Sequence, residues 1–170
     1  MVTQDIVERV VSYIKHQAEK PNDAIIDLVS RNQVRLLDVM ERVDDELASR
    51  APAPGEWSVR ELLAHVISAE AGVARLVEML ARGHAPQREA TPGEKPDDQR
   101  PFREMVASLR ATNEALLRAI RQLPPEPDLE TTAPHPFFGQ LNCKQWAVFQ
   151  RVHDEDHIQH ANKIIAAVSG

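Results

Sequence analysis

The chain is 170 residues long, the size of a single domain, and its 26 acidic and 20 basic residues give a formal net charge of −6 with histidine neutral. This charge argues against a nucleic-acid partner, because binding to a phosphate backbone needs a concentrated basic surface. No apolar run approaches the roughly 20 residues that a membrane-spanning helix needs, so no membrane partner is expected either.

Two further features bear on the cellular compartment. The N-terminal residues lack the pattern of a signal peptide. The one cysteine, Cys143, has no second cysteine with which to form an intrachain disulfide. Both observations fit a reducing cytoplasm, and a cytoplasmic location is therefore predicted. We find no internal repeat, and residues 1–170 are predicted to form one domain.

Apolar residues at helical spacing predict the elements of the N-terminal part. Residues 3–18 are predicted to form a short leading helix, which precedes the bundle proper at 21–170. After the K-P-N-D interruption, a longer helix is predicted from about residue 23 to 49. The prolines of the A-P-A-P-G stretch at 51–55 end it, because successive prolines cannot continue helical hydrogen bonding.

The next helix has a clear start signal. Ser58 and Glu61 form the S-x-x-E pattern of a capping box, and apolar residues at helical spacing continue to about residue 82. Residues 84–100 are rich in proline, glycine and charge, and they predict a long exposed connection.

Two helices are predicted in the remaining sequence. One runs from about 101 to 122, and a second long loop at 123–141 follows it. Asn142 is a suitable N-cap for a last helix over about 143–168. The pattern predicts an all-α fold, a four-helix bundle with long crossover loops and an extra short N-terminal helix.

Three of the seven histidines, His153, His157 and His160, lie within eight residues of the last predicted helix. Positions three, four and seven apart share one face of a helix, so the three histidines align with Trp146 and Ile164. The acidic residues between them are predicted mostly to face elsewhere.

This alignment has a structural and a chemical interpretation. A lone histidine on an apolar face is usually a hydrogen-bonded core residue. Three buried imidazoles without partners would cost on the order of 1–3 kcal/mol each, whereas one shared cation satisfies their nitrogens together. Histidines at i and i+4 can direct their rings at one ion, so metal binding by part of the trio is predicted.

A third ligand is expected from a facing helix, and His65 is the candidate because it lies at the edge of the apolar face of the helix at 58–82. Three neutral imidazoles leave a coordination position open, which suits Zn²⁺ or Ni²⁺. A metal in such a site lowers the pKa of a coordinated water or thiol.

Three segments resemble a known family in their order and rough separation: E-W-S-V-R-E-L-L-A-H-V at 56–66, H-P-F-F-G at 135–139, and Q-W-A-V-F-Q-R-V-H-D-E-D-H-I at 145–158. Over about residues 24–168 the chain resembles the DinB-like superfamily of metal-binding four-helix bundles, also called the DinB/YfiT type. The resemblance implies a divalent metal held by a histidine triad, namely His65, His153 and His157. It also implies that His160 neighbours the site without being a ligand, and that the protein is a homodimer.

The resemblance implies a metal-dependent enzyme with a small-molecule substrate. The function predicted first is a thiol-dependent S-transferase that acts on small electrophiles, with a low-molecular-weight thiol as co-substrate. One alternative is a metal-dependent hydrolase that uses a metal-activated water, and another is a non-catalytic bundle that binds a metal or a ligand. The reacting group would be the water or the thiol, and no side chain is assigned a catalytic role.

Two further residues are candidates for the surroundings of the metal. Glu70 falls near the centre of the apolar face of its helix, where a buried carboxylate could orient His65 or another ligand. An acid that reaches the end of the bundle or pairs with an arginine is an equal alternative. His135, in the loop before the last helix, could line the substrate entrance, although a role in setting a turn with Pro136 is favoured.

Overall fold

The computed structural model describes residues 4–86 and 95–169. Over these residues it contains six helices and one two-stranded antiparallel hairpin, in the following chain order: α1 (Gln4–Ala18), α2 (Asn22–Met40), α3 (Asp45–Ala48), α4 (Val59–Leu80), α5 (Phe102–Arg121), β1 (Ala133–His135), β2 (Gly139–Leu141) and α6 (Cys143–Val168).

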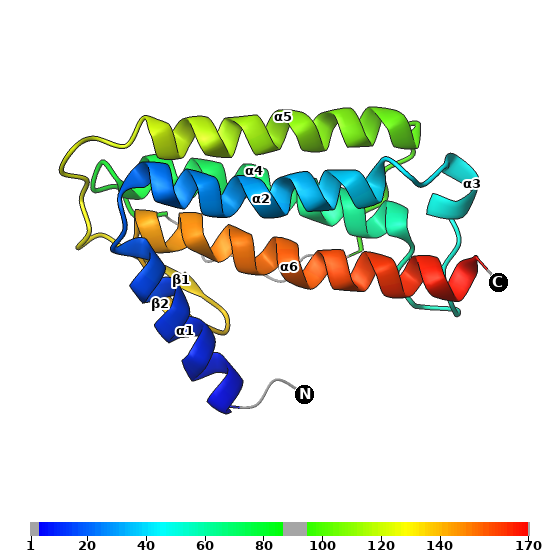
Figure 1. Ribbon diagram of the computed structural model, residues 1–170, viewed down its shortest axis with the longest axis horizontal. Helices are drawn as coiled ribbons and strands as arrows, with labels where there is room; N and C mark the ends of the chain where they lie inside the picture. Colours follow the sequence, from blue (N-terminus) through cyan, green and yellow to red (C-terminus); the bar gives the residue numbers. More distant parts are fainter. Residues whose placement is uncertain (1–3, 87–94, 170) are drawn as a thin grey trace.

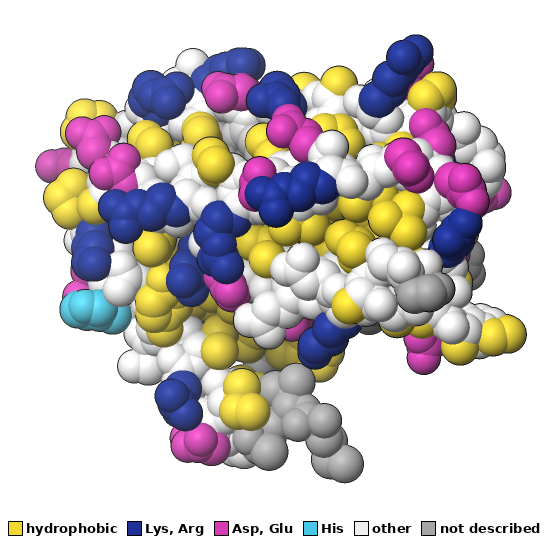
Figure 2. Space-filling model, turned by 45° about the vertical axis from the view of Figure 1, so that its right-hand side comes forward, with side chains coloured by type: hydrophobic (Ala, Val, Ile, Leu, Met, Phe, Trp, Pro, Cys, Tyr) yellow, Lys and Arg dark blue, Asp and Glu magenta, His cyan; other side chains and the backbone are white. Residues whose placement is uncertain are grey.

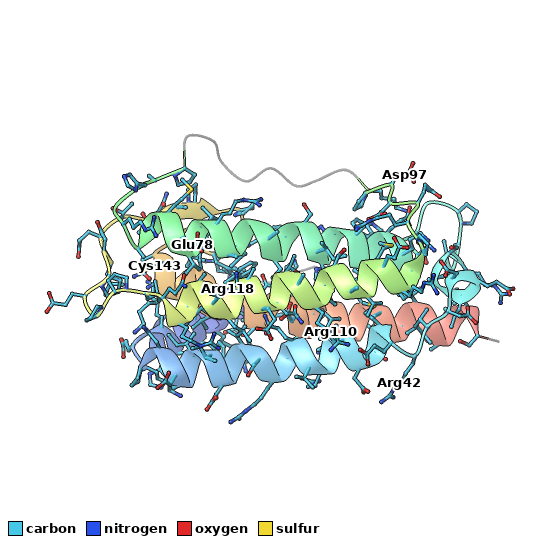
Figure 3. The ribbon with its side chains drawn as sticks, turned by 90° about the horizontal axis from the view of Figure 1, so that it is seen from above. Arg42, Glu78, Asp97, Arg110, Arg118 and Cys143 are labelled. Atoms are coloured by element: carbon cyan, nitrogen blue, oxygen red, sulfur yellow. The ribbon has the colours of Figure 1, made fainter. Side chains whose placement is uncertain are left out.

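Four of the helices form the bundle. α6 packs against α2 and α4, and α5 packs against the same two helices from the other side. Figure 1 shows α2 and α6 running in one direction along the bundle, and Figure 3 shows α2 and α4 flanking α5 with α6 behind it. α4 and α5 run in the opposite direction to α2 and α6, so the end of α4 and the start of α5 lie at opposite ends of the bundle. The predicted four-helix bundle with a long crossover is confirmed.

Local sequence sets the starts of α4 and α6. The Ser58 side chain accepts a hydrogen bond from the backbone of Glu61 (3.2 Å), and the Glu61 carboxylate accepts one from the backbone of Ser58 (2.8 Å). Asn142 and Gln145 make the same reciprocal pair at the start of α6, with both distances 3.0 Å. Each box satisfies two backbone N–H groups that a helix start leaves unpaired. Both helix starts predicted from the sequence are confirmed.

The helix predicted over 23–49 is wrong in one respect, because α2 ends at Met40 and a separate short helix begins at Asp45. The break follows from Asp44, whose carboxylate accepts a hydrogen bond from the backbone N–H of Leu47 (2.8 Å). This N-cap competes with continuation of α2 and starts α3 in a new direction. The loop predicted over 123–141 also differs, since it contains the hairpin of β1 and β2.

The interior of the bundle consists of two apolar clusters separated by buried polar side chains. One cluster fills the end where α2 and α6 begin, and the other fills the end where α4 and α5 begin. At the junction lie six buried polar residues from all four helices, which we call the polar belt: Asn32, Gln33, Glu70, Asn113, Gln150 and Asp154. Buried polar groups require partners, so the belt fixes how the four helices align along the bundle axis.

α1 lies outside the four-helix bundle, as the sequence predicts for an extra leading helix. Figure 1 shows it leaving the end of the bundle at an angle, near the hairpin. It packs on α6, with Ile14 and Ala18 buried. The guanidinium of Arg151 on α6 lies 5.3 Å from the centre of the Tyr13 ring, a cation–π contact that adds to this packing.

The surface carries charges of both signs. Figure 2 shows lysine and arginine side chains interspersed with acidic ones on the face in view, with hydrophobic side chains between them. Within the described ranges, none of the helices combines the length and the apolar character needed to cross a membrane.

Candidate metal centre

His65 on α4 and His153 and His157 on α6 bring their ring nitrogens together on one side of the bundle. Nε2 of His153 lies 3.3 Å from Nε2 of His65 and 3.0 Å from Nε2 of His157. One nitrogen from each ring lies within 4.8 Å of the other two. α6 presents its two histidines one turn apart, and the packing of α4 on α6 brings His65 to them.

These spacings fit a shared divalent ion. Two imidazole nitrogens at about 2.0–2.1 Å from one tetrahedral ion are about 3.3 Å apart, close to the two distances observed. Without an ion, three neutral rings facing one another leave at least one nitrogen poorly paired, because each neutral ring has only one N–H. The donor set of three imidazoles suits zinc or nickel and leaves room for another ligand.

The electrostatic surroundings keep these rings neutral. Burial lowers the pKa of His157 to about 3 and lowers the pKa of His65, and it lowers the pKa of His153 well below its ordinary value. The rings also disfavour each other's charged form by repulsion. A neutral imidazole offers a lone pair to a cation, so the site is ready to accept a metal near pH 7 without first losing protons.

The surroundings of His65 hold its ring in place. The ring of Trp57 meets it edge-on, with centres 5.6 Å apart. His160 lies farther along α6, with its ring centre 6.4 Å from that of His157, and it does not belong to the group of converging nitrogens. Its placement agrees with the neighbouring position that the family resemblance implies.

Gln150 and Asp154 are the side chains that sequence reasoning missed. Asp154 was predicted to face away from the histidines, yet it is buried in the polar belt, where Gln150 donates a hydrogen bond to it (2.6 Å). The amide nitrogen of Gln150 is also 3.5 Å from Nδ1 of His153. What the sequence did not reveal is this burial, because α6 packs against more than one helix and buries a second face, on which Asp154 lies.

Gln150, which lies next to His153, and Asp154 each have one buried oxygen that accepts no hydrogen bond from a described residue. Oε1 of Gln150 and the second oxygen of Asp154 are buried without a partner, and so is Nδ1 of His157. Burial and the nearby Glu70 carboxylate raise the pKa of Asp154 well above its ordinary value. If a metal bound Nε2 of His153, the ring proton would be on Nδ1, and Gln150 would accept a hydrogen bond from that N–H if its amide turned its oxygen toward the ring.

Glu70 is fully buried on α4, but its hydrogen bonds lead away from the metal ligands. It accepts from Nε2 of Gln33 (2.7 Å) and from the hydroxyl of Thr112 (2.9 Å). Asn113 adds a third donor when its amide nitrogen faces the carboxylate. Burial raises the pKa of Glu70 to about 7, and the first two hydrogen bonds oppose that rise. Among its described contacts, no hydrogen bond joins it to His65, and no arginine pairs with it.

A cavity of about 460 Å³ opens beside the three histidines. The hairpin brings His135 to it from one side, and α4 and α6 form the rest of the wall. We call this space the histidine cavity, and it is lined by His65, Ser68, Ala69, Gly72, Val73, Leu76, His135, Pro136, Phe137, Trp146, Phe149, His153 and His157. Its volume is in the range of sites that bind small molecules.

Two proteins of similar sequence cover most of this chain. The chain is 26% identical to YuaE, an uncharacterised protein of Bacillus subtilis, over 142 residues that cover 74% of this chain and 87% of YuaE. It is 22% identical over 140 residues to a protein of Oceanobacillus iheyensis that is provisionally named a metal-dependent hydrolase, with 80% of each chain covered.

Solved structures of similar fold support the same bundle. TT2238, described as a four-helix bundle protein, superposes with a TM-score of 0.65 at 22% identity and covers 84% of this chain and 98% of its own. YfiT from Bacillus subtilis is described as a probable metal-dependent hydrolase with an unusual four-helix bundle topology. It superposes with a TM-score of 0.64 at 16% identity, and the match covers 84% of this chain and 85% of YfiT. The model of the DinB superfamily matches residues 28–161, a span that includes His65, His153 and His157. By its sequence and its fold, the chain belongs to the DinB superfamily.

Proposed function

We propose that the protein is a metal-dependent enzyme that uses a divalent ion on His65, His153 and His157 to act on a small molecule. The observation that carries this proposal is the convergence of three neutral imidazole nitrogens at the wall of a cavity. A metal that only braced a bundle would be expected in a closed site, whereas this site faces a space that can admit a substrate.

A zinc or nickel ion held by these three histidines would act as a Lewis acid and would lower the pKa of a water or a thiol. The chain itself supplies the neutral donor rings, and Trp57 and Gln150 contact two of them. The apolar walls of the histidine cavity exclude water around the substrate, which strengthens electrostatic interactions within it.

Thiol transfer to a small electrophile is our first proposal for the reaction, with a low-molecular-weight thiol as co-substrate. This proposal rests on the resemblance to the superfamily, which implies a thiol-dependent transferase. Hydrolysis is the second candidate, and it is favoured by the names of the relative from Oceanobacillus iheyensis and of YfiT. The homodimer and the cytoplasmic location stay predictions.

The metal assignment is tested by the metal content of the protein. The protein is stripped with a chelator, incubated with Zn²⁺ or Ni²⁺, dialysed and subjected to elemental analysis. We expect about one ion per chain, and we expect His153→Ala to reduce affinity by well over tenfold. His160→Ala is the matched control, because it removes a histidine two turns along the same helix from His153 and should keep the metal. A wild-type protein that retains neither metal would refute the site.

The reaction is tested on metal-loaded protein with two model assays. One measures conjugation of 2-mercaptoethanol to 1-chloro-2,4-dinitrobenzene, and the other measures hydrolysis of 4-nitrophenyl acetate without thiol. Activity in the first assay that His153→Ala abolishes supports thiol transfer. Metal-dependent activity in the second assay alone favours hydrolysis. A fully loaded protein that is inactive in both, and across wider panels of electrophiles and esters, is the result expected of the non-catalytic bundle.

A further inference from the structure

The described residues that line the histidine cavity include no charged pair. Among the described residues that line it, none is aspartate, glutamate, lysine or arginine. Most of the wall is aliphatic or aromatic, and four histidines, three of them the candidate ligands, provide nearly all of its polar character. A charged or strongly hydrated substrate would lose its water in such a cavity without gaining an oppositely charged partner.

The fourth histidine, His135, is held in one orientation by its own turn. Its Nδ1 accepts hydrogen bonds from the backbone N–H groups of Phe137 (3.2 Å) and Phe138 (3.3 Å). The ring stacks on that of Phe138, with centres 4.6 Å apart and planes 15° apart, and its centre is 4.5 Å from that of Phe149. β1 and β2 fix the turn, and Trp146 donates from Nε1 to the backbone oxygen of Ala133 (3.3 Å), which anchors the hairpin to α6.

These contacts determine where His135 carries its proton. A ring nitrogen that accepts hydrogen bonds has no hydrogen of its own, so the neutral ring is protonated on Nε2. Burial lowers the pKa of His135 to about 4, so the ring stays neutral at pH 7. Over residues 4–86 and 95–169, Nε2 has no hydrogen-bond partner. Its N–H is therefore available to a molecule in the cavity.

The position of this donor relative to the candidate metal ligands is set by Phe149. The ring of Phe149 contacts both, with its centre 4.5 Å from that of His135 and 5.7 Å from that of His153. Trp146 cannot serve as a second donor, because its indole N–H is committed to Ala133. A small molecule bound at the metal would thus meet an aromatic wall and one imidazole N–H beyond it.

We propose that the histidine cavity selects an uncharged, largely apolar small molecule that carries a hydrogen-bond acceptor such as a carbonyl oxygen, and that His135 binds this acceptor through Nε2–H. This inference rests on the proposed metal site, and it narrows the class of substrate that the proposed enzyme would accept. His135 is then a substrate-binding residue as well as the residue that sets the turn, so the two roles weighed from the sequence are combined in one side chain.

The test uses Co²⁺-loaded protein, because thiolate coordination to Co²⁺ gives an absorption band that reports binding. The probes are 2-phenylethanethiol and 2-mercaptoacetophenone, which share one skeleton except that the second has a carbonyl group in place of a methylene. We expect the ketone to bind the wild-type protein about tenfold more tightly, the effect of one added hydrogen bond. Mercaptoacetate and 2-aminoethanethiol, the charged probes, should bind at least tenfold more weakly than 2-phenylethanethiol.

Two variants separate the donor from the turn. In His135→Asn, the amide oxygen can replace Nδ1 as acceptor for the turn, but no atom reaches the position of Nε2. In His135→Gln, the amide nitrogen reaches that position, but the acceptor for the turn is lost. We expect His135→Asn to lose the preference for the ketone and His135→Gln to keep a large part of it, while both bind Co²⁺ and 2-phenylethanethiol.

Each outcome is informative. A preference for the ketone that survives in His135→Asn would overturn the role of His135, and tight binding of a charged probe would overturn the proposed substrate class. Failure of both aromatic thiols to bind the Co²⁺-loaded protein would overturn the inference while leaving the metal site intact. Failure to take up Co²⁺ at all is a different result, because it refutes the proposed function on which the inference rests.

Discussion

Replacing Glu70 by glutamine should change how the stability of the metal-free protein depends on pH. Glu70 is fully buried in the polar belt, so its carboxyl group exchanges water for the interior when the protein folds. Burial raises its pKa from the ordinary value of 4.5 to about 7. Glutamine has nearly the same shape and cannot ionise, so Glu70→Gln removes the titration and keeps most of the packing.

The sign and size of the effect follow from linkage. As the pH rises from about 4.5 to about 7, the unfolded chain releases the Glu70 proton while the folded chain still holds it. The free energy of unfolding of the wild-type protein therefore falls over this range, by about 1.4 kcal/mol per pH unit. When the pH is raised from 5 to 8, the free energy of unfolding of the variant should increase by about 2 to 3 kcal/mol relative to that of the wild type. Relief of the repulsion with Asp154 acts in the same direction.

Urea unfolding of both proteins at pH 5 and pH 8 measures this difference, with a chelator present throughout. The titration of the histidines is shared by both proteins, so it cancels in the comparison. Glu78→Gln is the matched control, because Glu78, labelled in Figure 3, is an exposed residue of the same helix. This substitution should change the free energy of unfolding by less than about 0.5 kcal/mol at either pH. A stability difference between Glu70→Gln and the wild type that is the same at both pH values would refute the reasoning.

Three further predictions concern stability, each measured by urea unfolding at pH 7. Arg60→Ala should cost about 2 kcal/mol, because its mostly buried guanidinium joins the start of α4 to α3 and to the segment before α5; a loss below about 0.5 kcal/mol would show that these bonds contribute little. Ser58→Ala should lower the free energy of unfolding by about 1 kcal/mol through loss of the capping box, whereas Ser58→Thr should keep most of that stability. Equal losses in the two variants would contradict a capping role. Gly83→Ala should lower the free energy of unfolding more than Gly55→Ala does. Both glycines have positive φ, but only at Gly83 would a Cβ come within 2.9 Å of the Asp128 carboxylate. Equal losses in the two variants would argue against this close approach.

The sequence predicts well those features that depend on neighbouring residues. The capping boxes of Ser58 and Asn142 are local patterns, and both form as expected. The pair of His153 and His157 is one helical turn apart, and that spacing is enough to bring both rings to one point. His65 is different, because only the packing of two helices joins it to a residue 88 positions away. It was chosen from its place at the edge of an apolar helix face, and the family resemblance then implied the same residue.

Features that depend on competition or on tertiary packing were not predicted. The apolar spacing of Val43 and Leu47 is compatible with one long helix, and the break arises because the Asp44 side chain caps α3 instead. The strands of the hairpin are three residues each, too short to show an alternating pattern. Burial of Asp154 needed knowledge that α6 has helices on two sides, which one apolar stripe does not reveal.

The placement of the three histidines also has a consequence for the order of events during synthesis. His65 belongs to α4, whereas His153 and His157 belong to α6, which follows every other described helix in the chain. A ribosome therefore releases α2, α4 and α5 before it releases two of the three candidate ligands. The candidate metal site cannot form until α6 has docked between α2 and α4, so capture of a metal ion would mark completion of the bundle and would hold its latest helix in place.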